Sequence, residues 1–553
     1  MREGKAMRTG GEILVDQLVI QGVDRGFCVP GESYLAVLDA LFDANIELIT
    51  CRHEGGASMM AEAYGKLTGT PGICFVTRAP GFVNAMSGVH VAMQDSTPMI
   101  VFVGQIDTKM REREAFQEVN YRSLLSDHVK WVTEIDDAAR IPEIIGRAFH
   151  IATSGRPGPV VIALPEDMLT TQVMVGDSNK ISPVAISPSI NDMAQFEHLL
   201  STATNPIMIL GGSQWDAASV ERIEDFAARY SLPVAVQLRR QMLFSTEHEA
   251  FIGDVGLGIN PHLSHRIQAS DLVILFGGRF SENPSQSYSL LNIPVPEQTL
   301  IHIHADINEL NRVYQPDLAI NADPKEFTKM LSVLKLKNNW PSVLQEDRAA
   351  YLEWRDTTKI TLPGKLQMGE VMAFLNQELP ADSILTNGAG NFATWVHRFY
   401  HFRAFGTQAA PTSGTMGYGL PAAVAAKHLH PDRTVVCFAG DGDFMMSGEE
   451  FSTAVQYDIP IIVILVDNAM YGTIRMHQEM HYPTRVIGTK LSNPDFAEYA
   501  KAFGGVGFHV ETTAEFYDAW HRAVASKRPA IIHCLLDPEA ITPSKTLTEI
   551  SQR

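Results

Sequence analysis

The sequence predicts an α/β protein built from three doubly wound domains, each with a parallel sheet. Short apolar runs, such as residues 72–77 and 99–103, are typical of strands that are buried on both faces of a parallel sheet. Glycine-rich turns and helical patterns follow these runs, and the alternation repeats in three stretches of the 553-residue chain. A chain of this length has room for about three to four domains. We therefore expect three open sheets in series, each covered by helices.

The first domain is expected to span residues 1–172. A strand is predicted over residues 47–51 and a helix over residues 55–67, and the two strands named above follow. A polar stretch with three prolines, beginning near Asp177, separates this domain from the next.

The same alternation of strand and helix patterns predicts a central domain over residues 190–333 and a C-terminal domain over residues 365–540. The segment between them, residues 335–366, mixes charge, tryptophan and proline and is expected to be a linker. In the central domain we expect strands over 206–210, 272–276 and 299–303 and a helix over 217–230. In the C-terminal domain we expect strands over 434–438, 461–466 and 530–534 and a helix over 447–457.

Charge and composition exclude several classes of protein. The chain carries 44 Lys and Arg against 63 Asp and Glu, a net charge of −19. This argues against binding to a nucleic acid backbone or to an anionic membrane. Its five cysteines are scattered, which fits a reducing cytosol better than a disulfide framework. With no apolar run of membrane-spanning length and no apolar signal segment, we expect a cytoplasmic protein.

Polar residues follow two strands of the C-terminal domain. The run Gly440-Asp441-Gly442-Asp443 ends one strand, and Asn468 ends the next strand along the chain. One right-handed crossover would bring both to the carboxyl edge of a parallel sheet, where such sheets bind ligands. A carboxylate and an amide oxygen suit Mg²⁺, and Gly440 and Gly442 let backbone N–H groups approach a phosphate. A Gly-Asp-Gly run alone is more often an ordinary turn; the second half of the pattern favours a magnesium–phosphate site.

This pattern resembles the signature of thiamine-diphosphate-dependent enzymes, with Asp467 where many members have a second Asn. Residues 52–57 and 60–65 look like the segment that carries the activating glutamate, and residues 413–423 resemble the turn that clamps the coenzyme. These motifs occur in family order along nearly the whole chain. Within the decarboxylase and carboligase superfamily, the chain is most similar to the large catalytic subunit of acetohydroxyacid (acetolactate) synthase.

The resemblance implies a role for residues on both sides of the thiamine diphosphate. Glu54 matches the catalytic glutamate that hydrogen-bonds the aminopyrimidine N1′, and Phe116 and Gln117 match positions near the reacting carbon. The Gly414 carbonyl and the Met416 N–H would hold the edge of the pyrimidine, with the Met416 side chain bending the coenzyme.

The same resemblance implies the ligands of the coenzyme's charged end. Asp441, Asn468 and the backbone carbonyl of Met470 would bind Mg²⁺. The diphosphate contacts expected from the family are Gly390, Asn391, Gly442 and Asp443.

The family's architecture also implies the assembly and the substrate. The coenzyme lies between the glutamate-bearing domain of one chain and the Gly-Asp-Gly domain of another, so a homodimer or homotetramer follows. The substrate would be a small 2-oxo acid, with two pyruvates giving 2-acetolactate and CO₂. His477 stands where synthases carry a tryptophan that selects the acceptor, which leaves the acceptor open. The run Gly278-Arg279-Phe280 keeps part of a flavin-contacting motif, so bound FAD stays an alternative, and a regulatory subunit is left open.

The sequence leaves three alternative hypotheses to an acetolactate synthase-like enzyme. Benzaldehyde-lyase-like or oxalyl-CoA-decarboxylase-like chemistry uses the same coenzyme. A nucleotide-binding oxidoreductase is suggested by the glycines of residues 253–258, but their spacing lacks the dinucleotide fingerprint. A catalytically silent scaffold would have no chemical reason to retain Glu54, Asp441 and Asn468.

Overall fold

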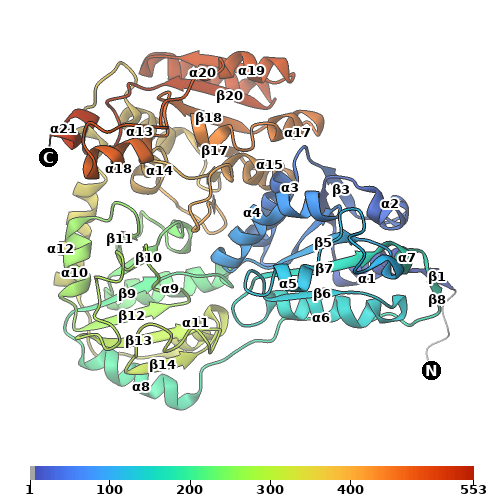
Figure 1. Cartoon of the computed structure of the whole chain (residues 1–553). Helices are drawn as coiled ribbons and strands as arrows, with labels where there is room; N and C mark the ends of the chain where they lie inside the picture. The colour runs from blue at the N-terminus through green and yellow to red at the C-terminus, as the bar shows by residue number, and fades with distance from the viewer. Residues whose placement is uncertain (1–6, 553) are drawn as a thin grey trace. The chain divides into compact units, whose positions relative to one another are not determined.

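The structure is a computed structural model that describes residues 7–552, and it contains three six-stranded parallel sheets (Figure 1). The α/β fold class predicted from the sequence is therefore confirmed. The described chain divides into two compact units. The first contains the residues up to Val184 with two later segments, Val424–Leu429 and Ser447–Tyr457; the second contains Ala185–Ala423, His430–Met446 and the chain from Asp458 onwards.

The sheet of the first unit has the strand order β3-β2-β4-β5-β7-β6. Alternate residues of its central strands form one core with helices α1 and α6, while α3 packs against α4. Two layers of helices thus keep this sheet from water, as continuous apolar strands require. Its strands are β2 (Arg25–Cys28), β3 (Glu47–Thr50), β4 (Gly72–Val76), β5 (Met99–Gln105), β6 (Trp131–Glu134) and β7 (Pro159–Pro165). Its helices are α1 (Gly10–Gln21), α2 (Leu35–Phe42), α3 (Glu54–Thr68), α4 (Ala79–Asp95), α5 (Tyr121–Leu124), α6 (Ile141–Thr153) and α7 (Glu166–Thr170), and β1 (Arg8–Thr9) pairs with β8 (Gln172–Val173) outside the sheet.

The central sheet, in the second unit, has the order β11-β10-β9-β12-β13-β14. The predicted linker over residues 335–366 is only partly a linker, because it contains helix α12, and Leu344 and Tyr351 of that helix belong to the central core. The strands are β9 (Pro206–Leu210), β10 (Val234–Gln237), β11 (Phe251–Val255), β12 (Leu272–Phe276), β13 (Thr299–His304) and β14 (Leu318–Asn321). The helices are α8 (Ile190–Thr202), α9 (Ala217–Tyr230), α10 (Pro261–Gln268), α11 (Pro324–Val333) and α12 (Pro341–Trp354).

The C-terminal sheet has the order β16-β15-β17-β18-β20-β19. The chain leaves β15 toward one side of the sheet and leaves β17 toward the other, so the strand order reverses between these two strands. Ligands of open α/β sheets bind at such a switch point. The strands are β15 (Ile384–Asn387), β16 (Gln408–Ala409), β17 (Val435–Gly440), β18 (Ile462–Asp467), β19 (Val506–Val510) and β20 (Ala530–Leu535). The helices are α13 (Met368–Glu378), α14 (Ala393–Phe399), α15 (Gly419–Leu429), α16 (Asp441–Phe444), α17 (Glu450–Gln456), α18 (Gly472–His481), α19 (Phe496–Ala502), α20 (Thr513–Ser526) and α21 (Leu547–Ser551).

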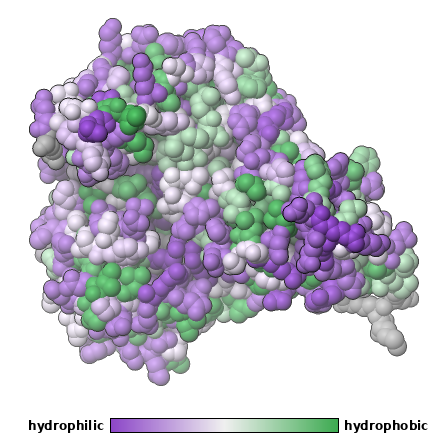
Figure 2. Space-filling view, in the orientation of Figure 1, coloured by the Kyte–Doolittle hydropathy of each residue, from purple (hydrophilic) through white to green (hydrophobic). Residues whose placement is uncertain are grey.

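The surface is mainly hydrophilic on the face shown in Figure 2, with apolar side chains in scattered groups. Among residues 7–552, we find no helix with both the length and the apolar character that a bilayer crossing requires.

A buried ion-pair network joins α3, which begins at Glu54, to α4. Lys66 of α3 lies 3.3 Å from Glu62 and also pairs with Asp95 at the end of α4. The side chains of Glu62 and Asp95 are fully buried, and Thr97 donates a further hydrogen bond of 2.6 Å to Glu62. The network therefore helps to fix the helix that carries the predicted catalytic glutamate.

Replacing Lys66 with methionine should destabilise the first unit strongly. Lys66→Met would remove the ammonium group that pairs with both buried carboxylates, and breaking a buried ion pair in this way costs about 3–5 kcal/mol. Urea unfolding measures the loss in free energy of unfolding, and hydrogen exchange of the amides in α3 and α4 locates it. Lys109→Met, at an exposed lysine in the loop after β5, is the matched control. Equal protection in the two variants would contradict the assigned role.

Candidate functional site

A cavity of about 230 Å³ lies at the carboxyl ends of β15, β17 and β18, at the switch point of the C-terminal sheet. Every residue of this sheet's domain that the sequence assigns to the metal or to the coenzyme lines it. These residues are Gly390, Asn391, Gly414, Met416, Asp441, Gly442, Asp443, Asn468 and Met470. The structure thus brings together in one cavity residues that lie up to ~80 positions apart in the sequence, from Gly390 to Met470.

The predicted metal ligands meet because β17 and β18 are paired in parallel. Gly440 lies opposite Val466 in the register, so Asp441 and Asn468 leave the same edge of the sheet. Asp441 is only 3% exposed, and its Oδ2 accepts hydrogen bonds from the Met470 N–H at 3.1 Å and from the Asn493 amide at 2.8 Å. These contacts hold the carboxylate at the carboxyl ends of β17 and β18.

The environment of Asp441 opposes the ionisation of its carboxyl group. Burial, together with the nearby negative charge of Asp467, raises the pKa of Asp441 to about 6. The amide of Asn493 bridges the two acids, since it also donates to Asp467 at 2.8 Å. A divalent cation beside Asp441 would remove this penalty. Asn493 carries no motif signal, and only the fold shows its position.

Asp443 has a structural task that the sequence does not reveal. Its Oδ1 accepts hydrogen bonds from the Ala389 N–H at 2.9 Å and the Gly417 N–H at 3.0 Å. The side chain thereby ties the loop after β15 to the turn that carries Gly414 and Met416. Burial raises the pKa of Asp443 to about 7. The diphosphate contact predicted for Asp443 stays a prediction, and its carboxylate is already engaged by these two backbone N–H groups.

Two glycines of the cavity are required by its geometry. A Cβ on Gly442 would lie 2.5 Å from the ring of Tyr471, so no larger residue fits beside that ring. Gly414 has φ of +69°, in the left-handed region that side chains disfavour. Asn391 completes this wall: its amide donates to the Ile541 carbonyl at 3.1 Å and accepts from Thr473 at 2.9 Å.

Glu54 lies in the first unit, as the first residue of α3. It is half-buried, and Asn84 of α4 donates a hydrogen bond of 3.0 Å to its Oε2. The preceding residue, His53, caps the helix by accepting from the Gly55 N–H at 3.0 Å. Asn84 therefore orients one carboxylate oxygen of Glu54 and leaves Oε1 available.

Glu450 of α17 is a positioning residue that sequence reasoning missed. It is fully buried, and its carboxylate accepts from the backbone N–H groups of Arg52, at 3.1 Å, and His53, at 2.9 Å. A Cβ on Gly56 would clash with this carboxylate, so the glycine makes room for it. Glu450 thus shapes the turn that leads into Glu54, and no local pattern links residues so distant in the chain.

Phe116 and Gln117 lie in the loop between β5 and α5, also in the first unit. Phe116 is 73% exposed and Gln117 has φ of +65°. The loop is held from within, because the Glu118 carboxylate accepts from the Glu112 N–H at 2.7 Å and the Ala115 N–H at 2.9 Å.

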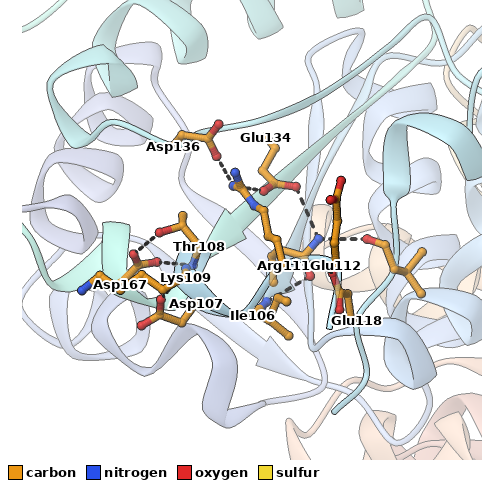
Figure 3. Close-up of polar contacts among 12 residues, drawn as sticks. Ile106, Asp107, Thr108, Lys109, Arg111, Glu112, Glu118, Glu134, Asp136 and Asp167 are labelled. Atoms are coloured by element: carbon orange, nitrogen blue, oxygen red, sulfur yellow. Dashed lines mark hydrogen bonds and ion pairs between the residues drawn. The ribbon is translucent and has the colours of Figure 1, made fainter. Parts of the chain in front are cut away.

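Side chains from the end of β6, from Asp136 just after it and from α7 hold the base of this loop. Figure 3 shows Arg111 pointing toward Glu134 and Asp136, with which it pairs, and Thr108 bonded to Asp167. The loop therefore presents an exposed aromatic side chain on an ordered frame.

Comparison with known proteins assigns all three sheets to one family. The N-terminal, central and C-terminal domains of thiamine pyrophosphate enzymes match residues 8–124, 193–331 and 388–534, and the two outer domains are described as thiamine pyrophosphate-binding. The chain is 30% identical to the acetolactate synthase isozyme 2 large subunit of Escherichia coli (strain K12), over 96% of this chain and 95% of that protein.

Two further relatives agree. An acetolactate synthase large subunit of Parasynechococcus marenigrum is 30% identical over 95% of this chain and 87% of its own length. A probable acetolactate synthase large subunit of Methanocaldococcus jannaschii is 28% identical over 98% and 95%. The chain therefore belongs to the thiamine pyrophosphate (thiamine diphosphate) enzyme family.

Proposed function

We propose that the protein decarboxylates a 2-oxo acid with thiamine diphosphate and Mg²⁺ and joins the product to a second carbonyl, forming 2-acetolactate and CO₂ from two pyruvates. The observation that carries the proposal is the cavity at the switch point, where Asp441 and Asn468 meet Gly414 and Met416. The names of the relatives support the reaction. The pyrimidine-binding, central and diphosphate-binding domains would span residues 1–172, 190–333 and 365–540.

The residues at the strand ends fit Mg²⁺ by their chemistry. A buried carboxylate whose pKa is raised, next to an amide oxygen, offers hard oxygen donors of the kind that Mg²⁺ prefers. We propose Asp441, Asn468 and the Met470 carbonyl as ligands, with coenzyme phosphate oxygens and water completing the octahedron. The N-H groups at Gly442 and Asp443 would face the diphosphate, with Gly390 and Asn391 on the opposite wall.

Bound thiamine diphosphate supplies a carbon nucleophile and an electron sink; the protein orients it and controls protons. We propose that Glu54 holds and transfers a proton at the pyrimidine ring through Oε1, since Asn84 occupies Oε2. Met416 would support the bent coenzyme, and the Gly414 carbonyl would accept from the ring edge. Phe116, on its ordered loop, would cover the reacting carbon together with Gln117.

A site formed by two chains follows from this proposal. We propose a homodimer or homotetramer in which Glu54 of one copy serves the cavity of the next. The relatives are called large subunits, and a regulatory partner is left to experiment. The acceptor is also left open, because His477 of α18 is exposed and stacks parallel to His481 at 6.1 Å instead of providing a broad apolar wall.

Bound FAD stays an alternative for the central domain. Arg279 and Phe280 line a cavity of about 140 Å³ there, together with the buried His302. The colour of the purified protein tests this alternative: a yellow protein would favour bound FAD and the synthase reaction, whereas a colourless protein would show that no flavin is retained.

An assay of the purified protein with pyruvate, thiamine diphosphate and Mg²⁺ tests the reaction. We expect release of CO₂ together with acetolactate. Retention of the coenzyme with neither product would remove pyruvate as the donor and favour benzaldehyde-lyase-like or oxalyl-CoA-decarboxylase-like chemistry. Release of CO₂ with acetaldehyde alone would contradict the carboligation.

Replacing Glu54 with glutamine tests the assigned proton transfer. Glu54→Gln keeps the shape and the hydrogen bond from Asn84 but removes the ionisable group, so turnover should fall at least about 100-fold. Coenzyme affinity and thermal stability should change little. Glu143→Gln, at an exposed glutamate of α6 in the same unit, should retain wild-type turnover. Equal activity of the two variants would reject the role of Glu54.

Replacing Asp441 with asparagine separates metal binding from folding. Asp441→Asn removes a buried charge, so the apoprotein should be at least as stable as the wild type. The variant should lose the rise in melting temperature that coenzyme and Mg²⁺ give the wild type, because a neutral amide binds the cation more weakly. Asp458→Asn, at an exposed turn before β18, should keep the full rise. A full rise in Asp441→Asn would contradict the ligand assignment.

A further inference from the structure

Two histidines lie side by side at the outer edge of the C-terminal sheet. His509 of the edge strand β19 and His533 of β20 are partners in the parallel register, and their ring centroids are 5.4 Å apart at an angle of 85°. Asp495, the residue before α19, joins them. Within residues 7–552, the ligand atoms of these three side chains lie within 4.8 Å of one another.

His533 has a polar atom with no hydrogen-bond partner. The residue is only 3% exposed; its Nε2 lies 3.0 Å from Oδ2 of Asp467, while Nδ1 is buried and makes no hydrogen bond in the described chain. The nearest acid, Asp495, has its Oδ1 at 3.6 Å from Nδ1, beyond hydrogen-bond range. A buried polar nitrogen left in this way is costly, and native proteins satisfy nearly all such groups.

A metal ion would satisfy this nitrogen. We propose that Nδ1 of His533, the imidazole of His509 and the carboxylate of Asp495 bind one divalent transition-metal ion of the zinc type. Two imidazole nitrogens and one carboxylate oxygen suit Zn²⁺, whereas Mg²⁺ prefers oxygen ligands alone. Bonds of about 2.0–2.2 Å require the ligand atoms to draw together by about 1 Å. The side chain of His509 is exposed, and Asp495 is held in place by the Ala497 and Glu498 N–H groups, so His509 would make most of this movement.

The surroundings have the arrangement that supports metal-binding histidines. The ring nitrogen opposite the ligand nitrogen commonly bonds to a carboxylate, which fixes the tautomer. Asp467 plays this part for His533, and it is itself held by the Ala469 N–H at 2.8 Å. The Nε2 of His509 has a carboxylate partner in Glu511 at 3.2 Å.

None of the three proposed ligands lines the coenzyme cavity, and Asp467 connects the two places, since it bonds to His533 and, through Asn493, to Asp441. The proposed ligands come from the edge strand β19, from the neighbouring strand β20 and from the start of α19, so a bound ion would cross-link these three elements. Open positions on the ion would face water, since His509 and Asp495 are exposed. The inference concerns binding alone and does not depend on the reaction that the enzyme catalyses.

Titration of Zn²⁺ into the holoenzyme, with thiamine diphosphate and excess Mg²⁺ present, tests the inference. Calorimetry should show one Zn²⁺ per chain that Mg²⁺ does not displace. His509→Ala and Asp495→Asn should each weaken this binding at least about tenfold. Asparagine keeps the capping of α19, so the second variant should fold normally. His521→Ala, at an exposed histidine of α20, is the matched control and should bind as the wild type does.

Co²⁺ gives a second readout in the same variants. Bound at two imidazoles and a carboxylate, it should produce visible absorption that His509→Ala abolishes. Absence of Zn²⁺ binding in excess Mg²⁺ would overturn the inference. Equal Zn²⁺ affinity in the wild type, His509→Ala and Asp495→Asn would overturn it as well, because the ion would then be bound elsewhere.

Discussion

The buried carboxylate of Asp441, held beside a second acid at the ends of two paired strands, is the constraint on which the rest of the site depends. The parallel pairing of β17 and β18 leaves no other place for the residues that follow each strand. Burial and the charge of Asp467 work against ionisation of Asp441, and Asn493 offsets only part of that cost. The position of Asp441 thus lowers the stability of the free protein, a pattern common where function opposes stability.

The fold surrounds this centre with backbone contacts. Asp443 ties the loop after β15 to the turn bearing Met416, and Asn391 ties the same loop to Thr473 and Ile541. In the other unit, hydrogen bonds of Glu450 and Asn84 position Glu54: Glu450 accepts from the N–H of the preceding residue, and Asn84 donates to the carboxylate. Hydrogen bonds of polar side chains therefore set the geometry of the site, and those of Asp443 and Glu450 are accepted from backbone N–H groups. The predicted catalytic groups lie at the ends of rigid elements. Precise sites commonly have such supporting contacts.

The fold class and much of its detail could be predicted because apolar runs and glycine turns are local signals. Strand β9 and helix α9 have the bounds that their patterns predict. Helix α12 was missed because proline and charge at its start hide an apolar stripe that packs only in the tertiary structure. The helix predicted over residues 447–457 begins later, at Glu450, because residues 445–449 form turns after the short helix Asp441–Phe444. Glu450 and Asn493 could not be found from sequence, because their partners lie far along the chain.

The most direct test of the account measures how tightly the protein binds thiamine diphosphate with Mg²⁺ and after chelation of all divalent cations, with thiamine as the comparison. If Asp441 and Asn468 hold a cation that grips the diphosphate, affinity for thiamine diphosphate should fall at least about tenfold on chelation, a loss of about 1.4 kcal/mol or more. Thiamine should bind weakly under both conditions. Equally tight binding of thiamine diphosphate with and without divalent cation would contradict the central claim.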